Sequence, residues 1–309
     1  MRRCTILFAV ISILLPVTVS SQTQTPEAAV NHFNNAVKKS GDGDLDGAID
    51  DYTRAITLSS RFTGTRSGNS FGDASVENIR VVDPFTANVY TNRGLTRYLK
   101  GDYPGAIEDF NEALKIRPGL KSVYLNRAAA FRATGDFAAA LKDLDRAISI
   151  DKNFYQAYSN RGSLQLDMGN KQAALTDLNR AIQLNKQVAE TFYQRGYTYL
   201  AFNNFDSAVA DFESAIKLDP EMAWAFQGRG TALMYKGAML RAIEDFNRAL
   251  ELDPNMVWAY CNRGLIRMYL GNETEAQKDF NECLRLKPDI KAELESRIEL
   301  AKHLRRIVQ

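Results

Sequence analysis

A period of 34 residues is the feature of this sequence that most constrains its fold. Between residues 87 and 288 one pattern recurs six times, and glycine occupies the same place in five of the six copies. These glycines are Gly94, Gly162, Gly196, Gly230 and Gly264, with Ala128 in the remaining copy. A repeat of this length is typical of arrays in which each unit stacks on its neighbours. We therefore expect one elongated solenoid rather than several compact domains.

Each copy has further fixed places after the glycine. An alanine follows by twelve residues, at Ala106, Ala140, Ala174, Ala208, Ala242 and Ala276. A large apolar residue comes four places later, at Phe110, Leu144, Leu178, Phe212, Phe246 and Phe280. Small side chains let two helices cross closely, and the large ones fill the space between units. Each copy is expected to form two amphipathic helices joined by a turn such as Gly101-Asp102.

Composition excludes several classes of protein. The chain is 45% hydrophobic and 25% charged, and its formal charge of +2 gives no reason to expect a nucleic-acid or other polyanionic partner. Three cysteines in 309 residues do not make a disulfide framework. Cys261 and Cys283 both lie in the last full copy, and the sequence leaves open whether they pair or remain two buried thiols.

The first residues have the features of a secretory signal. Arg2 and Arg3 precede the apolar run from Ile6 to Leu15, and small residues follow Pro16. We predict a signal peptide over 1–21, an exported protein that is periplasmic or secreted, and no integral membrane span after cleavage. The alternative is a membrane anchor formed by an uncleaved N-terminal segment, although the run is shorter than the ~20 residues that span a bilayer.

A divergent first unit is predicted over 27–62. Counting back from Ala48 places Ala36 in the glycine slot, whereas the apolar spacing favours an inter-helix turn one or two residues longer. The turn contains Asp42, Asp44 and Asp46, an alternation similar to a calcium-binding loop. Such a loop needs a glutamate where this chain has a threonine, so we interpret the stretch as another Gly-Asp turn.

The remaining boundaries follow from the period. A Gly/Ser-rich insertion is predicted over 63–86, and a capping helix over 289–308. Six units lie between them, at 87–120, 121–154, 155–188, 189–222, 223–256 and 257–288.

The pattern resembles the tetratricopeptide repeat (TPR). In the last copy the residues that carry the resemblance are Tyr260, Gly264, Ala276, Phe280 and the closing Pro288. The resemblance implies an all-α, right-handed superhelical solenoid of about seven helix-turn-helix units with a C-terminal capping helix. It also implies that the first helices of the units line a concave groove.

Signals for an enzyme are nearly absent. The two histidines, His32 and His303, lie near opposite ends of the chain, and no phosphate loop or nucleophile motif occurs. We predict no catalytic residue, no metal site and no cofactor. An arginine and an aspartate recur in every full unit, and a charge repeated this regularly indicates a structural Arg–Asp contact. The arginines are Arg93, Arg127, Arg161, Arg195, Arg229 and Arg263, and the aspartates are Asp109, Asp143, Asp177, Asp211, Asp245 and Asp279.

The residue before each arginine gives a sharper functional signal. A carboxamide stands there in five units, as Asn92, Asn126, Asn160, Gln194 and Asn262, and Gly228 interrupts the row. The row resembles the asparagine ladder in the repeats of O-linked N-acetylglucosamine transferases. That resemblance implies hydrogen bonding to the backbone of an extended peptide. The alternative is that these side chains only solvate or cap the helices.

Aromatic residues in the C-terminal half complete the predicted groove. They are Tyr193, Tyr197, Trp224, Tyr235, Trp258 and Tyr269. Such residues dominate binding surfaces, although packing against the next unit is an equal alternative. We predict a non-catalytic scaffold or adaptor that binds an extended peptide or a partner protein. A glycan-binding or cell-wall-associated adaptor is the alternative, followed by an enzyme. The oligomeric state is not predicted.

Overall fold

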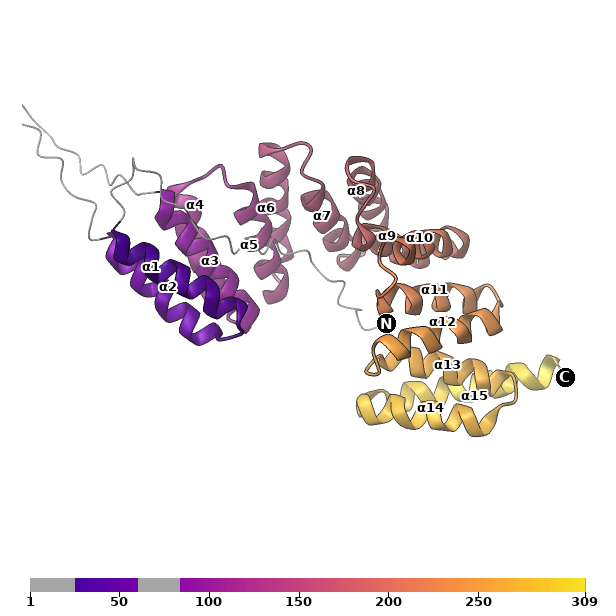
Figure 1. Cartoon of the computed structure of the whole chain (residues 1–309). Coiled ribbons are helices and arrows are strands. Elements are labelled where there is room, and N and C mark those ends of the chain that lie inside the picture. The colour runs from indigo at the N-terminus through magenta and orange to yellow at the C-terminus, as the bar shows by residue number, and fades with distance from the viewer. Residues whose placement is uncertain (1–25, 61–83, 309) are drawn as a thin grey trace, which may run out of the picture. The chain divides into compact units, whose positions relative to one another are not determined.

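The computed structural model describes residues 26–60 and 84–308, which form helices joined by short turns, with no β-strand in these ranges (Figure 1). The helices are α1 (Glu27–Gly41), α2 (Leu45–Ser60), α3 (Pro84–Lys100), α4 (Tyr103–Ile116), α5 (Lys121–Thr134), α6 (Phe137–Ile150), α7 (Tyr155–Asp167), α8 (Lys171–Leu184), α9 (Ala189–Ala201), α10 (Phe205–Leu218), α11 (Ala223–Tyr235), α12 (Met239–Leu252), α13 (Val257–Tyr269), α14 (Glu273–Leu286), the 3-10 helix η1 (Pro288–Ile290) and α15 (Lys291–Val308). This order confirms the predicted all-α array of helix pairs and its final capping helix. The predicted signal peptide lies outside the described residues, as does the predicted insertion up to position 83.

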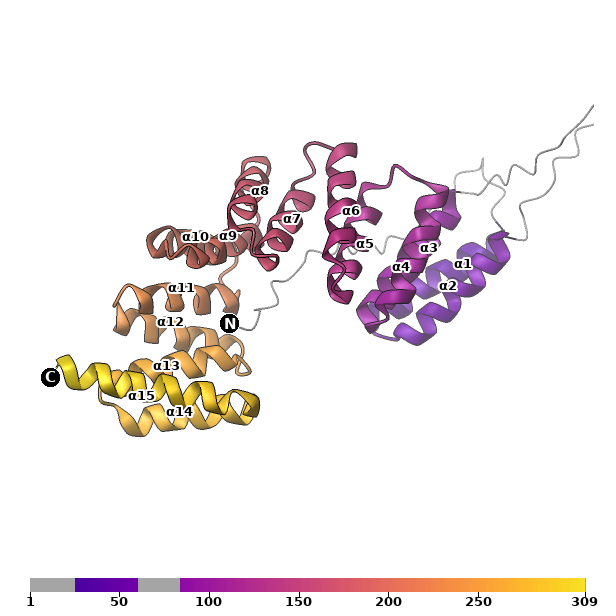
Figure 2. The same cartoon turned by 180° about the vertical axis from the view of Figure 1, so that it is seen from behind.

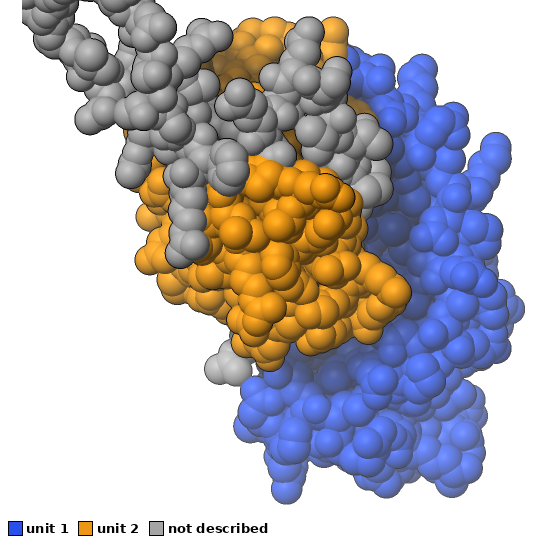
Figure 3. Space-filling model, turned by 60° about the vertical axis from the view of Figure 1, so that its left-hand side comes forward, with its two compact units in different colours: residues 1–7, 165–309 blue, residues 8–164 orange. Residues whose placement is uncertain are grey.

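The chain divides into two compact units, which Figure 3 colours separately. Among the described residues, unit 1 contains 165–308 and unit 2 contains 26–60 and 84–164, with the boundary inside α7. Within a unit, the two helices of each repeat pack on each other, and the second helix packs on the first helix of the next repeat. Helices α9, α10 and α11 show this order in unit 1, which Figure 2 presents from behind.

Close helix crossings account for the small residues of the repeat. A β-carbon added at Gly94 would lie 2.8 Å from the ring of Phe110, and one added at Gly264 would lie 2.6 Å from that of Phe280. The predicted alanines are fully buried, at Ala106, Ala140, Ala174, Ala208, Ala242 and Ala276. The prediction that these places require small side chains is therefore confirmed.

The first repeat, formed by α1 and α2, follows the same spacing as the other repeats. Gly43 has φ +85° and Gly101 has φ +87°, so each supplies the left-handed residue that ends a first helix. Ala36 is fully buried and lies seven residues before Gly43, as Gly94 does before Gly101. The distance from the crossing residue to the turn glycine is therefore unchanged, while the turn between α1 and α2, residues 42–44, is one residue longer than the turn between α3 and α4, as predicted.

The aspartates of that turn have a capping role. Asp44 accepts a hydrogen bond from the amide of Gly47 at 2.9 Å, and Asp102 accepts one from Gly105 at 3.0 Å. Both therefore satisfy a free amide at the start of a second helix. Over the residues that the structure describes, no group of three His, Cys, Asp or Glu side chains is placed to hold a metal ion.

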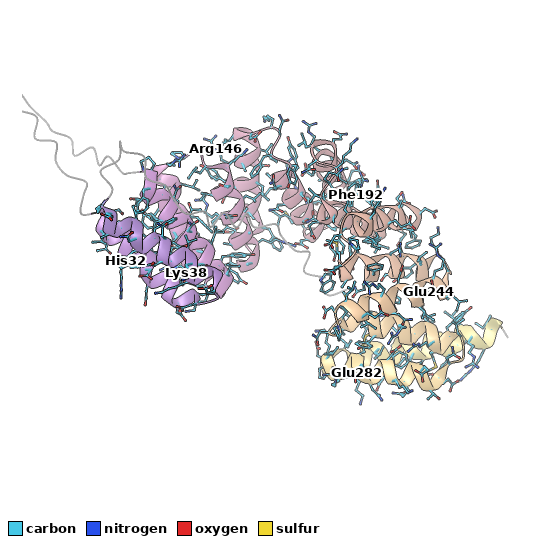
Figure 4. The ribbon with its side chains drawn as sticks, viewed as in Figure 1. His32, Lys38, Arg146, Phe192, Glu244 and Glu282 are labelled. Carbon is cyan, nitrogen blue, oxygen red and sulfur yellow. A yellow bond between two sulfur atoms is a disulfide. The ribbon has the colours of Figure 1, made fainter. Side chains whose placement is uncertain are left out.

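A bridge centred on arginine joins successive repeats. Arg195 Nε and Nη2 donate to the two carboxylate oxygens of Asp211, both at 2.7 Å, and Nη1 donates to Asn179 Oδ1 of the preceding repeat at 2.8 Å. Its guanidinium carbon lies 5.7 Å from the ring centroid of Phe192, which Figure 4 labels on α9. The same Arg–Asp pair occurs in four other repeats whose two partners belong to the same compact unit. These pairs are Arg93–Asp109, Arg127–Asp143, Arg229–Asp245 and Arg263–Asp279. The predicted Arg–Asp contact is confirmed for these five repeats.

The first repeat holds its aspartate differently. His32 Nδ1 lies 2.9 Å from Asp51 Oδ1, and Lys39 Nζ donates to Oδ2 at 2.7 Å. Figure 4 labels His32 on α1. Burial raises the pKa of the Asp51 carboxyl, but the hydrogen bonds from Lys39 and His32 outweigh burial and hold that pKa below its usual value.

A disulfide joins Cys261 on α13 to Cys283 on α14, with the two Cα atoms 5.5 Å apart. Both residues are fully buried. The bond therefore links the two helices of the last repeat covalently.

Removing one partner of the buried bridge should cost more than removing both. Asp211→Ala leaves the Arg195 guanidinium without its carboxylate, and we expect a loss of about 3 kcal/mol in the free energy of unfolding. Arg195→Ala combined with Asp211→Ala should lose less, as measured by urea unfolding. Lys278→Ala, which breaks an exposed pair with Glu275, serves as the control and should change stability by less than about 1 kcal/mol. Equal losses for the single and double variants would contradict the pairing.

Loss of the disulfide should weaken the last repeat. The two cysteines are 22 residues apart in the sequence, so the disulfide closes a loop of that size. Replacing both Cys261 and Cys283 by alanine should lower the free energy of unfolding by about 3 kcal/mol. Mass spectrometry of a digest prepared without reductant should recover the two cysteine peptides as one linked species. Recovery of both as separate alkylated peptides would show that the bond does not form.

Candidate interaction surface

The predicted binding residues all lie on the first helices of their repeats. We call the surface formed by these helices the helix-A face, which in unit 1 is formed by α9, α11 and α13. Asn92, Asn126 and Asn160 belong to unit 2, and the other predicted residues belong to unit 1.

The carboxamides of the predicted row are buried. Exposed fractions run from 0% for Asn160 and Gln194 through 1% and 4% for Asn126 and Asn92 to 6% for Asn262. Two of these side chains bond within the protein: Gln194 Nε2 donates to Glu190 Oε1 at 3.1 Å, and Asn262 Oδ1 accepts from Arg297 Nη2 at 3.0 Å. Readout of a peptide backbone by the row remains a prediction.

Hydrogen bonds cross from one first helix to the next in unit 1. Gln227 Nε2 on α11 lies 3.5 Å from the Tyr197 hydroxyl on α9, and Asn262 Nδ2 on α13 lies 3.5 Å from the Thr231 hydroxyl on α11. Asn262 Oδ1 in turn accepts from Arg297 Nη2 on α15 at 3.0 Å. These contacts link the neighbouring first helices of unit 1, and α15, along the helix-A face.

Packing explains why Gly228 interrupts the carboxamide row. A β-carbon at this position would lie 2.5 Å from the ring of Phe212. That ring is held in an aromatic cluster, with its centroid 6.1 Å from Tyr193 and 5.5 Å from Tyr197. The space that a carboxamide would need is therefore filled by the Phe212 side chain.

The predicted aromatic residues differ widely in exposure. Trp224 and Tyr235 are 45% and 60% exposed, whereas Tyr193 is only 4% exposed. The other three, Tyr197, Trp258 and Tyr269, are partly buried. Tyr235 is held in place by stacking on Phe205, with centroids 5.2 Å apart and an interplanar angle of 14°. The two most exposed of the predicted aromatic residues thus lie at opposite ends of α11.

Glu190 occupies the place in its repeat that Trp224 and Trp258 occupy in theirs. Burial raises the pKa of the Glu190 carboxyl to about 7, against a smaller lowering by the hydrogen bond from Gln194. This acid therefore titrates near neutral pH on the helix-A face of unit 1.

Sequence reasoning missed two residues of this network. Gln227 lies one residue before the place of the carboxamide row, so the 34-residue spacing of that row does not include it. Arg297 lies 34 residues after Arg263, so extending the arginine column by one period would have found it.

The predicted binding residues, all of which the structure describes, do not form an enclosed pocket. An open hollow of about 420 Å³ lies between α4 and α5, lined by Glu108, Asn111, Glu112, Leu114, Lys115 and Arg127. None of the predicted binding residues lines it. Across residues 26–60 and 84–308, no helix combines the length and the apolar character needed to cross a bilayer.

Stacked helix pairs with an exposed first-helix surface define a class of repeat scaffold. Models of the tetratricopeptide repeat match residues 87–120, 122–154, 155–188, 193–257 and 259–290, which is more than half of the chain. The chain belongs to the tetratricopeptide repeat family. Such repeats bind proteins or peptides, so the chain is a protein–protein interaction scaffold, and proteins of this family are in general non-catalytic.

Solved structures support the same fold. A tetratricopeptide repeat protein from Parabacteroides merdae is 17% identical, with 89% of this chain and 99% of that chain covered and a TM-score of 0.65. PilF from Pseudomonas aeruginosa is 17% identical, covering 67% of this chain and 97% of that chain with a TM-score of 0.60. No curated protein matches the sequence.

Glu190 should make stability depend on pH. Its pKa in the folded chain, about 7, exceeds the ordinary value of 4.5, so the folded state binds the proton more tightly. The stabilisation is complete below about pH 4.5 and is lost as the pH rises toward 7. Glu190→Gln should remove this dependence and melt at a higher temperature than the wild type at pH 8. The exposed Glu221→Gln is the matched control. Parallel melting profiles for the two variants from pH 4.5 to 8 would contradict the assignment.

Proposed function

We propose that the chain is an exported, non-catalytic adaptor that binds an extended peptide or a partner protein on its helix-A face. The observation that carries the proposal is the exposure of Trp224, at 45%, on the first helix of a repeat. Trp224 shares α11 with the exposed ring of Tyr235, and tryptophan and tyrosine are enriched where binding energy concentrates.

The surroundings of Trp224 favour a protein ligand. Tyr235 lies at the other end of α11, and its stacking on Phe205 reduces the side-chain freedom that binding would otherwise remove. Glu190, one repeat earlier, adds a carboxyl group that can accept hydrogen bonds from a ligand. Apolar anchors beside a few polar groups are the usual composition of a peptide-binding surface.

Export is proposed on the N-terminal sequence and on the disulfide. Residues 1–21 have the composition of a secretory signal, and the Cys261–Cys283 bond suits an oxidising compartment. Both the periplasm and the exterior of the cell meet this condition. Retention of the segment as an anchor is the alternative, and sequencing of the mature N-terminus distinguishes the two.

A glycan is the second candidate ligand. It is favoured by the stacked pair Phe205–Tyr235, because Tyr235 presents a ring that is 60% exposed. A sugar face could pack on such a ring.

Substitution of Trp224 tests the proposal. Partners crosslinked to the wild-type chain in the exported fraction are identified by mass spectrometry, and the affinity of the main partner is then measured with purified proteins. Trp224→Ala should weaken binding by ~30-fold, the effect of removing an anchor worth about 2 kcal/mol. Leu240→Ala is the control, because Leu240 is 70% exposed but lies on the second helix α12.

Three further variants separate the candidates. Asn126→Ala and Asn160→Ala should weaken partner binding if the carboxamide row reads a peptide backbone. Loss of polysaccharide binding with unchanged protein binding in Tyr235→Ala would favour the glycan. Equal partner recovery by the wild type and by the Trp224, Asn126 and Asn160 variants would exclude the helix-A face as the binding surface.

A further inference from the structure

The last helix, α15, lies in an unexpected place. Between the repeats of unit 1, a first helix packs mainly on the second helix of the repeat before it, as α11 does on α10 and α13 on α12. By contrast, α15 packs mainly on α13, the first helix of the last repeat, and both views show it running beside α13 (Figures 1 and 2). It therefore covers the helix-A face of the last repeat.

The outer face of α14 does not need this helix as a cover. Its side chains there are polar and exposed, including Gln277, Lys278 and Asn281. Gln277 Nε2 donates to Asn281 Oδ1 at 2.9 Å along the same helix. As the final helix, α15 therefore caps the array by covering α13 rather than this polar surface of α14.

The contact between α15 and α13 has the chemistry of a helix bound in an apolar site. Leu294, Ile298 and Ala301 lie at spacings of four and three residues, and this stripe packs in one cluster with the buried residues of α13. Those residues are Cys261, Leu265 and Met268, with Trp258 at the margin of the cluster.

Two polar tethers flank the apolar stripe. Arg297 donates to Asn262 Oδ1 at 3.0 Å, and Arg305 donates to Glu273 Oε1 at 2.9 Å. The Arg305 Nε atom is buried with no hydrogen-bond partner among the described residues, so this second tether is incompletely satisfied.

The C-terminal half of α15 is held less firmly. Leu300, Leu304 and Ile307 are 57%, 45% and 67% exposed, and the last turns extend beyond α13 in both views (Figures 1 and 2). Among the described residues, the stripe from Leu294 to Ala301, the buried Ile290 just before the helix and the two tethers attach it. A segment with so few buried contacts is the kind that opens locally while the rest of the protein stays folded.

We propose that the helix-A face of the last repeat, formed by Trp258, Cys261, Asn262, Leu265 and Met268, is a binding site for an amphipathic helix. In the free chain α15 occupies this site, and a partner helix of the same pattern replaces it. The inference rests on the proposed function, since it names the partner chemistry for one end of the same surface.

The residues of α15 define the matching helix. It carries a large aliphatic residue at two places four apart and a small residue three further, as Leu294, Ile298 and Ala301 do. An arginine just before the second aliphatic residue reaches the carboxamide of Asn262, as Arg297 does. Binding is therefore by a helix laid on the site rather than by an extended chain.

A peptide of residues 289–308, acetylated, amidated and labelled with a fluorophore, tests the proposal by anisotropy. The wild-type chain should bind it weakly, because the attached α15 competes at an effective concentration in the millimolar range. The full chain with Arg297→Ala and Arg305→Ala should bind at least about tenfold more tightly, because its own helix lacks both tethers and the peptide has them. A peptide with Leu294→Asp and Ile298→Asp should not bind.

Two controls keep the result decisive. Adding Trp224→Ala to the double variant should leave peptide binding unchanged, because Trp224 lies on α11 and not on α13. Loss of peptide binding in this triple variant would place the peptide on another site and overturn the proposal. In the unaltered chain, excess peptide should speed hydrogen exchange of the α15 amides. Slow exchange there, or no binding to a double variant with native circular dichroism, would also overturn it. Partner recovery that still depends on Trp224 would leave the proposed function intact in that case.

Discussion

The geometry of the array depends on one guanidinium group that recurs in five of its repeats. Arg195 holds the carboxylate of its own repeat with two hydrogen bonds and the carboxamide of the preceding repeat with a third, while Phe192 supports its plane. Buried ion pairs add little net free energy, but their fixed hydrogen-bond directions specify one arrangement of the helices. Because this arrangement is set on one side of each first helix, the side chains on the other side are free to vary.

The repeated part of the structure could be predicted from the sequence, because each contact that stacking requires leaves a mark every 34 residues. Gly94 against Phe110 and Arg195 against Asp211 are examples. The surface was less predictable. Asn262 has the place of a groove residue, yet its carboxamide is taken by Arg297 and Thr231, and this outcome depends on helix roll rather than on residue type. Pairing of Cys261 with Cys283 likewise depended on distances that no spacing supplies.

The helix-A face of unit 1 contains two environments that sequence alone would treat as equivalent. Trp224 and Trp258 stand at the same place in adjacent repeats, but the first is open to water and the second lies at the margin of the cluster under α15. The residues one helical turn or two further along also differ in polarity: α11 has Gln227 and Thr231, where α13 has Cys261 and Leu265. Two neighbouring repeats with one fold can therefore present different surfaces, one mixed in polarity and one apolar.

The arginine bridge also bears on how the chain reaches its fold. The two polar partners of Arg195 lie sixteen residues before it and sixteen after it, so the bridge closes only short loops. Short loops lose little entropy on closure, and a chain built from them does not wait for distant segments to meet. Folding can begin at any repeat and spread to its neighbours. A chain with more repeats would therefore add further folding steps of the same kind and would not introduce a slower step.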